Sequence, residues 1–270
     1  MDYSIIIVHW NTPDLLKKQL EVLYSSSEAQ AKSRSSNVIL ARPDSDSRLR
    51  SNNNIETVVV DNASVSSLSF LKKEFPHVKF IQNEENLGYA RACNQGAKLA
   101  RGEWLLFLNP DVEITTDSIK HLIKSAEERG LDAASPKTGE NYEKPLPTPL
   151  SLLVEFTPLK YIIPSSLFRK RTLFGGCLLI KKSILNKVGG WDEDFFLWFE
   201  DSDLTRRLTD KGYKAGFVET KIKHVGGVSF QKLSEKYNRK IFFTSMQTFA
   251  DKHFSAFGKF VVSQLNKKYT

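Results

Sequence analysis

The sequence predicts an α/β protein whose central sheet is mostly parallel and doubly wound, with helices on its flanks and a helical tail at its C-terminus. Three observations support this fold class. Short apolar runs alternate with amphipathic segments through the first half of the chain. Polar residues follow several of these runs directly, as at the carboxyl ends of parallel strands. With 270 residues and 40% hydrophobic content, the chain can bury a substantial core.

The first half of the chain supplies four strands and three helices in alternation. The apolar runs predict buried strands at 4–9 (SIIIVH), 55–61 (IETVVVD), 78–82 and 104–108 (WLLFL). The helices are expected after Thr12 and Pro13, around Leu68 to Phe75, and over 88–100. The Ser-, Asn- and Arg-rich stretch 25–54 interrupts this order, and we expect it to be a mobile insertion.

The second half is expected to complete the same domain, which we place at 1–230. The elements expected there are a helix at 117–129, a strand at 173–180 (LFGGCLLI), a helix at 202–211 and a strand at 215–218. The proline-rich stretch 136–164 has little periodicity and predicts a long surface excursion or lid. Residues 231–270 carry aromatic residues at helical spacing and predict a C-terminal helical extension, with core packing favoured over a membrane anchor.

Composition narrows the class of partner. A formal net charge of +8 and a pI of about 9.3 suit nucleic acid, an anionic membrane or a phosphorylated substrate. The basic residues are spread along the chain, with a local knot at 169–171, and no nucleic-acid motif accompanies them, which argues against nucleic acid. Cys93 and Cys177 are expected to be buried free thiols. Because no leader or long apolar run is evident, we expect a cytoplasmic protein.

Polar residues at three strand ends are expected to share one crevice. They are His9 to Asn11, Asp61 with Asn62, and Asn109 with Asp111. Asp111 suits Mg²⁺ or Mn²⁺ bridged to a diphosphate, although Asn-Pro-Asp is also an ordinary turn sequence. Asp61 suits the N3-H of uracil or thymine, although it also suits a helix cap. Two such acids in one half of a parallel sheet favour a nucleotide site.

A second acidic group follows five apolar residues at 195–199. Glu200, Asp201 and Asp203 there suit a general base, because a carboxylate beside desolvated surface has a raised pKa. The alternative is a helix cap, which we favour for Asp203. His224 suits a metal ligand or a phosphate contact, although a lone histidine is more often neither.

An ordered set of segments carries a family resemblance over most of the chain, from Ser4 to about Phe230. The segments are SIIIVHWN, VVVDNAS, NEENLGYARACNQG, WLLFLNPD, FGGCLLI, GGWDEDFFLWFEDSDL and KHVGG. Together they resemble the inverting glycosyltransferases of the GT-A fold, family 2, and within it the bacterial rhamnosyltransferase-like group. The resemblance implies a nucleotide-sugar-binding half at 1–112 and an acceptor-binding and catalytic half at 113–230.

The resemblance also implies roles for individual residues, and Asp201 matches the family's catalytic base. The residues implied at the nucleotide are Asn11, Asp61, Arg91, Asn109 and Asp111. Asn109 and Asp111 stand where the family has its metal-binding Asp-X-Asp motif, with Asn in place of the first acid. Asp111 and His224 are the implied metal ligands. The residues implied on the acceptor side are Gly175, Gly176, Trp191, Asp192 and Glu200.

The expected activity is transfer of a sugar from a dTDP- or UDP-sugar to an acceptor hydroxyl, with inversion and with Mg²⁺ or Mn²⁺ as cofactor. By resemblance the donor is dTDP-rhamnose, and the acceptor is a saccharide or lipid-linked saccharide, with peripheral contact at the inner face of the membrane. Two other classes compete. A nucleotidyltransferase needs a glycine-rich phosphate loop after its first strand, which HWNTPD lacks. A non-catalytic nucleotide- or carbohydrate-binding module has no need of Asp201.

Overall fold

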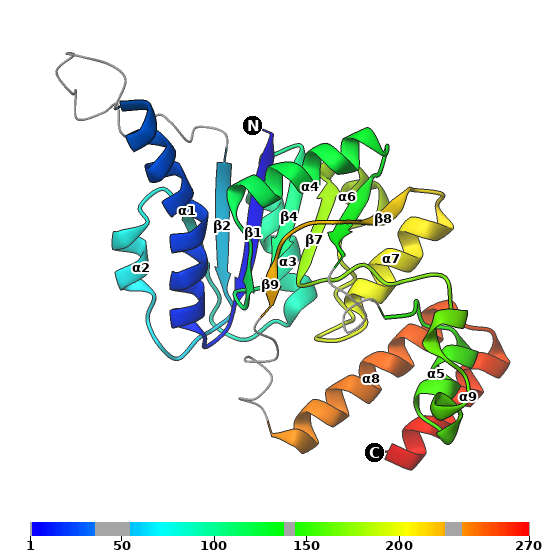
Figure 1. Cartoon of the computed structure of the whole chain (residues 1–270). Helices are drawn as coiled ribbons and strands as arrows, with labels where there is room; N and C mark the ends of the chain where they lie inside the picture. Colours follow the sequence, from blue (N-terminus) through cyan, green and yellow to red (C-terminus); the bar gives the residue numbers. More distant parts are fainter. Residues whose placement is uncertain (1, 36–54, 138–143, 225–233, 270) are drawn as a thin grey trace.

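The computed structural model describes residues 2–35, 55–137, 144–224 and 234–269, and it confirms the predicted fold class (Figure 1). A seven-stranded sheet runs in the order β3-β2-β1-β4-β7-β6-β8. Its strands are β1 (Tyr3–His9), β2 (Ile55–Asp61), β3 (Lys79–Gln82), β4 (Trp104–Leu108), β6 (Ala133–Pro136), β7 (Cys177–Lys181) and β8 (Ala215–Val218). A two-stranded sheet pairs β5 (Val112–Glu113) with β9 (Lys223–His224).

The sheet is mixed, because β7 runs against both of its neighbours. The strands β1, β2, β3 and β4 are mutually parallel, and β6 pairs in parallel with β8. The antiparallel pairings of β7 are with β4 and β6. In the register of β1 and β2, His9 lies opposite Asp61 at the last pair. The carboxyl ends of the four parallel strands therefore meet at one edge, where ligands bind in open α/β sheets.

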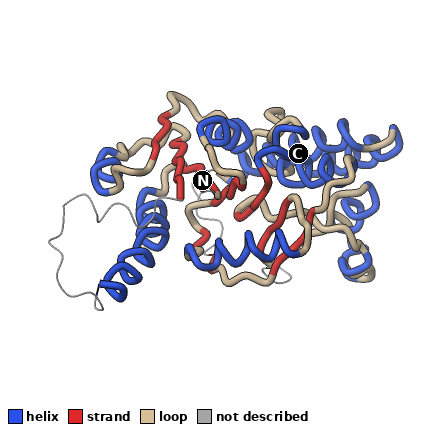
Figure 2. Tube along the Cα trace, turned by 90° about the horizontal axis from the view of Figure 1, so that it is seen from above, coloured by secondary structure: helices blue, strands red, loops and turns tan. Residues whose placement is uncertain are grey.

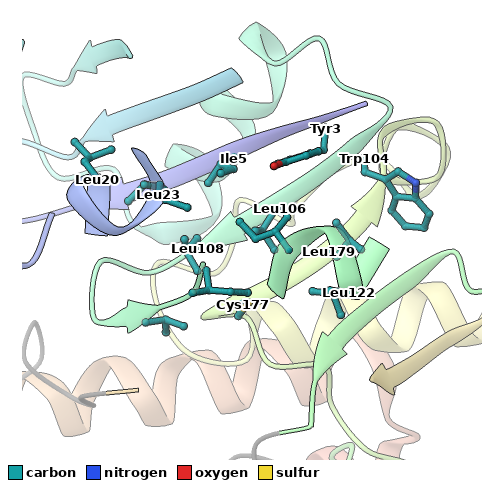
Figure 3. Packing of buried hydrophobic residues seen from close by; sticks show 14 of the residues in the cluster. Tyr3, Ile5, Leu20, Leu23, Trp104, Leu106, Leu108, Leu122, Cys177 and Leu179 are labelled. Carbon is teal, nitrogen blue, oxygen red and sulfur yellow. The ribbon is translucent and has the colours of Figure 1, made fainter. Parts of the chain in front are cut away.

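Helices cover both faces of the sheet, as the view from above shows (Figure 2). One face packs against α1 (Pro13–Ser35), α2 (Ser69–Glu74) and α4 (Thr116–Glu128). The other packs against α3 (Tyr89–Leu99), α6 (Lys182–Val188) and α7 (Glu200–Asp210). Alternate residues of β1 serve the two faces, since Ile5 joins the first cluster and Ile6 the second. Figure 3 shows the first cluster, in which Leu106 of β4 lies between its strand partners Ile5 and Leu179.

A third apolar cluster joins the last two helices to the middle of the chain. It involves α5 (Pro149–Glu155), α8 (Glu235–His253) and α9 (Ala256–Tyr269), with Leu152, Phe243 and Met246 buried among them. Short 3₁₀ turns follow α5 at Pro158–Tyr161 and Ser165–Leu167. The predicted core packing of the C-terminal aromatic residues therefore holds for α8, where Phe243 and Phe249 are buried, but not for Phe257 and Phe260 of α9, which are exposed.

Several elements differ from the sequence-based expectations. Helix α1 continues to Ser35, so the stretch 25–54 is not irregular throughout, and its remainder at 36–54 lies outside the described residues. The excursion expected at 136–164 contains α5, whose Thr148 and Ser151 form a reciprocal capping box. Strands β5, β6 and β9 were not expected. Helix α7 begins at Glu200 rather than near Ser202. Both cysteines are buried free thiols, as expected.

Candidate functional site

The first part of the site is the carboxylate of Asp61, at the last residue of β2. It is 1% exposed, and its Oδ1 accepts from the backbone N–H of Ser64 at 3.1 Å. Its Oδ2 has no hydrogen-bond partner among the described residues. A buried carboxylate oxygen without a donor is rare, because burial without compensation costs free energy. The Asp61 carboxylate is therefore suited to accept a hydrogen bond from a ligand.

Asn11 lies beside Asp61, in the turn that follows β1. Its φ of 54° is in the left-handed region, which Asn tolerates better than most residues. The turn is tied to the loop after β2, because the Asn11 N–H donates to Oγ of Ser64 and the N–H of Val65 donates to the Asn11 side-chain oxygen, both at 2.8 Å. These bonds order the two strand ends that flank the crevice.

The second part of the site combines Asp111 and His224. Asp111 follows β4, and the pairing of Val112 with His224 in the small sheet brings the histidine next to it. The His224 Nε2 atom lies 3.4 Å from Oδ2 of Asp111, and each side chain is 12% exposed. Oδ1 of Asp111 is buried with no hydrogen-bond partner in the described part of the chain. Strands β2 and β4 lie on either side of β1. The backbones at their carboxyl ends, near Asp61 and Asn109, are therefore about 10 Å apart, which is two strand spacings.

These two residues fit part of a metal site. A carboxylate oxygen without a partner and an adjacent imidazole are ligand types that Mn²⁺ accepts, and Mg²⁺ accepts the carboxylate. No group of three or more Asp, Glu, His or Cys side chains suited to a metal occurs among the described residues. An ion held by Asp111 and His224 would therefore need its other ligands from diphosphate oxygens and water.

A turn at Gly175 and Gly176 connects this second part to Asp201. The backbone N–H of Asn109 donates to the carbonyl of Gly176 at 2.9 Å, so the turn lies against the end of β4. The backbone N–H of Gly175 donates to Oδ2 of Asp201 at 3.4 Å. A Cβ added to Gly175 would lie 3.0 Å from Cβ of Asp201. The absence of a side chain at Gly175 thus leaves room for the Asp201 carboxylate.

Asp201 sits in the first turn of α7, part-buried, where the helix dipole favours a negative charge. Burial raises the pKa of its carboxyl group. Hydrogen bonds from the backbone N–H of Ser202 and Gly175 and the positive charge of Lys144 oppose this rise. The distance from the Ser202 nitrogen to Oδ1 is 2.7 Å. Asp201 is therefore a fixed carboxylate with increased basicity, as a general base requires.

Glu200, the neighbour of Asp201, is buried and 8% exposed. Burial, with the adjacent charge of Asp201, raises the pKa of Glu200 to about 8. Its Oε2 has no hydrogen-bond partner among the residues described. Glu200 is thus largely protonated at neutral pH, when Asp201 carries the negative charge of the pair, because two close carboxylates resist joint ionisation.

The residues just before this pair adopt a strained backbone. Trp198 and Phe199 have φ values of 70° and 66°, in a region that bulky L-residues rarely occupy. Helix α8 braces them: the Phe199 ring packs on Phe242 and Phe249 at centroid distances of 5.3 and 5.7 Å. The hydroxyl of Ser245 donates to the carbonyl of Leu197 at 2.7 Å. The C-terminal extension therefore holds the loop that leads into Asp201.

The interpretation of Asp203 as a helix cap is wrong. Phe199 occupies the N-cap position, and no side chain caps α7. Asp203 is fully buried and forms an ion pair with Arg207, whose Nε donates to Oδ2 at 2.7 Å. Nε2 of His253 lies 2.8 Å from the other carboxylate oxygen. Asp203 therefore joins α7 to α8.

The proposed acceptor-side residues Trp191 and Asp192 contact other parts of the protein and do not line a surface crevice among the described residues. Trp191 is 1% exposed, and its ring packs edge-on against Phe107 at a centroid distance of 5.0 Å. Its indole Nε1 has no hydrogen-bond partner within the described segments. Asp192 pairs with Lys252 of α8 at 2.9 Å. The assignment of Trp191 and Asp192 to the acceptor stays a prediction.

Arg91 lies on α3, with its side chain half-exposed. Its Nε is 3.7 Å from a carboxylate oxygen of Glu193, which is also half-exposed. It lines a cavity of about 590 Å³ between α3 and α6, together with Asn94, Lys98 and Lys182. The structure thus places Arg91 beside a basic cavity, and its assignment to the nucleotide stays a prediction.

Three further residues connect the parts of the site, and two of them, Tyr89 and Lys144, were not singled out from the sequence. The Tyr89 hydroxyl donates to the carbonyl of Gly175 at 2.9 Å, which ties α3 to the turn. Asn62 accepts from the N–H of Leu87 and donates to the carbonyl of Gly88, so it fixes the start of α3. Lys144 contributes a positive charge near Asp201. Lys144 falls in the proline-rich excursion, where no periodic signal marks it.

The fold and these carboxylates define an α/β protein whose site lies at the carboxyl ends of its strands. The chain belongs to glycosyl transferase family 2, whose profile matches residues 4–189. A second profile, the N-terminal domain of galactosyltransferase, matches residues 163–229. The second match contains Asp201, and the first contains Asp61 and Asp111.

Two curated relatives are similar over part of their length. The low-salt glycan biosynthesis hexosyltransferase Agl10 of Haloferax volcanii is 27% identical over 173 residues, which are 60% of this chain and 55% of the relative. The N-acetylglucosaminyl-diphospho-decaprenol L-rhamnosyltransferase of Mycobacterium tuberculosis is 26% identical over 204 residues, 61% of this chain and 64% of the relative. The matches thus span 55 and 64% of the two relatives.

Solved structures of glycosyltransferases share the fold. The mannosyltransferase PcManGT from Pyrobaculum calidifontis, in complex with GDP-Man and Mn²⁺, aligns with a TM-score of 0.58 at 16% identity, over 97% of this chain and 73% of that one. TarS residues 1–349 of S. aureus, in complex with UDP-GlcNAc, align with a TM-score of 0.55 at 16% identity, over 100% and 71%. The central sheet with its C-terminal helices is therefore of the GT-A type.

Proposed function

We propose that this protein transfers a sugar from a nucleoside-diphosphate donor to an acceptor hydroxyl with inversion at the anomeric carbon, in the synthesis of a glycan or cell-wall polymer. The observation that carries the proposal is the Asp201 carboxylate. The N–H groups of Gly175 and Ser202 donate to this carboxylate, and burial raises its pKa. The turn at Gly175 and Gly176 also contacts the end of β4, which leads to Asp111. Family membership supports the reaction class.

In the proposed step Asp201 accepts the proton of the acceptor hydroxyl while that oxygen attacks the anomeric carbon. The bond from this carbon to the donor diphosphate breaks, and its electron pair leaves with the phosphate oxygen. Direct displacement from the opposite side inverts the configuration. Lys144, whose charge reaches Asp201, stabilises the carboxylate before proton transfer.

The donor is proposed to lie along the strand ends. Asp61 accepts from the uracil or thymine N3-H, Asn11 orders the turn beside it, and Asn109 lies near the diphosphate. Asp111 and His224 would hold Mg²⁺ or Mn²⁺, and such an ion would supply positive charge that stabilises the leaving diphosphate. The Mn²⁺ in the PcManGT complex and the unpaired Oδ1 of Asp111 support this assignment.

The finer identity of the substrates rests on the resemblance and on the relatives. dTDP-rhamnose is the proposed donor, since the Mycobacterium tuberculosis relative is named as a rhamnosyltransferase. That name also places its acceptor on a diphospho-decaprenol carrier, so a lipid-linked saccharide is the proposed acceptor here. Because the TarS complex contains UDP-GlcNAc and the PcManGT complex contains GDP-Man, UDP- and GDP-sugars should also be tested as donors.

A melting experiment with a panel of nucleotide sugars tests the donor. A ligand that binds only the folded protein raises its melting temperature by mass action. We expect dTDP-rhamnose with Mn²⁺ or Mg²⁺ to raise it most, and Asp61→Ala to abolish that rise. Product analysis by NMR then separates transferase from binding module: inverted product is expected. Stabilisation without any donor consumption in the presence of acceptors would favour the binding module.

A further inference from the structure

One end of the molecule carries an exposed apolar surface. It consists of side chains that are each more than half exposed, on α5, the two 3₁₀ segments and α9: Leu150 (55%), Tyr161 (82%), Ile162 (77%), Leu167 (66%), Phe257 (73%) and Phe260 (59%). We call this set the apolar end surface. It holds six of the ten large apolar side chains that are exposed among the described residues. Such a concentration marks an interaction site rather than a random scatter.

Three of the segments that carry this surface are packed together, namely α5, the first 3₁₀ turn and α9. Helix α5 contacts both α9 and the 3₁₀ turn after it. A Cβ on Gly258 would lie 2.7 Å from Cγ of Pro149, so the residues next to Phe257 and Leu150 meet directly. Figure 1 shows α5 and α9 together at one end, away from α1 and α2. The exposed side chains therefore lie on neighbouring segments of one end.

These segments and the residues that flank them in sequence are rich in positive charge. Residues 144–171 and 254–269 contain eight Lys or Arg and one acid, Glu155, a formal charge of +7 out of +8 for the chain. Lys160 lies 5.1 Å from the ring centroid of Tyr161, and Lys259 sits between Phe257 and Phe260 in sequence. Aromatic and aliphatic side chains bordered by cations are the composition that binds an anionic bilayer surface.

We propose that the apolar end surface docks on an anionic lipid bilayer. The surface is also connected to the catalytic region, which gives docking a consequence. The charge of Lys144 at the start of the segment reaches Asp201, and the hydroxyl of Thr172 just after its end lies 3.1 Å from that of Ser202. Docking would therefore bring Asp201 near the lipid headgroups, where a lipid-anchored acceptor lies. The docking itself does not depend on the proposed reaction.

Sedimentation with vesicles tests the docking without donor or acceptor. The wild-type chain should bind phosphatidylcholine vesicles that contain phosphatidylglycerol at low salt. It should dissociate at high salt, because screening weakens the attraction of the lysines. Binding to pure phosphatidylcholine should be at least tenfold weaker, since each basic residue near an anionic surface contributes about fivefold. Equal binding to both vesicles, or no binding to either, would overturn the proposal.

Paired substitutions locate the surface. Phe257→Ser with Phe260→Ser, and separately Tyr161→Ser with Ile162→Ser, should each weaken vesicle binding by about tenfold or more. The matched control is Phe70→Ser with Leu99→Ser, which removes two exposed apolar side chains (43% and 48%) elsewhere. The control pair should leave binding unchanged, and equal loss in all three variants would count against this surface. A wild-type dimer that these pairs dissociate, without vesicle binding, would reassign the surface to self-association.

Discussion

Asp203→Asn should destabilise the protein through a buried ion pair that spans α7 and α8. The carboxylate of Asp203 is 1% exposed and is shared between Arg207 and His253. Asn keeps the volume of the side chain but removes the negative charge. Arg207 would still donate to the carbonyls of Val188 and Gly190, at 2.7 and 2.9 Å, so part of its compensation remains.

The magnitude follows from burial. Removing one partner of a buried pair costs about 3–5 kcal/mol, and the remaining carbonyl contacts of Arg207 place this site at the low end, at about 3 kcal/mol. For a chain of 270 residues that corresponds to a melting temperature lower by about 5 °C.

The matched control is Asp210→Asn on the same helix. Asp210 forms an i,i+4 pair with Arg206, but the two side chains are 52% and 30% exposed. An exposed pair contributes about 0.3–0.5 kcal/mol, so the melting temperature should fall by about 1 °C or less. Differential scanning calorimetry of both variants measures the two shifts. Equal, small shifts would refute the buried pair, and a loss of turnover in a fully folded Asp203→Asn sample would refute its purely structural role.

Three further predictions concern the site itself. Gly175→Ala should lower turnover by about tenfold or more with a small change in melting temperature, because the new Cβ displaces Asp201; unchanged turnover would show that the turn does not position the carboxylate. Glu200→Gln should raise the melting temperature relative to wild type increasingly between pH 5 and 8. The raised pKa means that the folded wild-type protein loses stability as pH rises through this window, and a constant difference would contradict the buried, protonated Glu200. EDTA should stop transfer, and added Mn²⁺ or Mg²⁺ should restore it. In Asp111→Asn the Mn²⁺ concentration that gives half-maximal transfer should be at least tenfold higher than in the wild type. Full activity after chelation would remove the metal from the mechanism.

Much of the sheet was predictable because its strands are continuous apolar runs. The limits of β2 and β4 agree with the runs IETVVVD and WLLFL, because strands buried on both faces are rich in consecutive apolar residues. By contrast, β5 and β9 have two residues each and exist through their mutual pairing. Their pairing is what brings His224 to Asp111, a contact between residues far apart in sequence that no local pattern encodes.

The site shows the same division between local and long-range information. Asp61, Asp111 and Asp201 were candidates from the sequence because each follows an apolar run, and their roles stay predictions. The role of Asp203 was not, because its partner His253 lies on a helix 50 residues later and a first-turn acid ordinarily suggests a cap. Helix α7 begins at Glu200 instead of near Ser202, because Phe199 before it has a left-handed conformation. The packing of the Phe199 ring against α8 accompanies this conformation.

No helix among the described residues has the length and apolar character that crossing a bilayer requires. The C-terminal helices instead take part in two arrangements. Helix α8 braces the loop before Asp201, and α9 contributes Phe257 and Phe260 to the apolar end surface. Substitutions in α9 should therefore alter vesicle binding, whereas substitutions in α8 should alter stability and turnover.

Turnover of Asp201→Asn tests the central claim most directly. The substitution keeps the shape of the side chain and removes its basicity, so transfer should fall by about 10²- to 10⁴-fold, the usual contribution of a positioned base. Donor affinity should stay within about twofold and the melting temperature should not fall, since Asn relieves the burial of a charge. A folded Asp201→Asn protein with wild-type transfer would contradict the assignment of Asp201 as the general base.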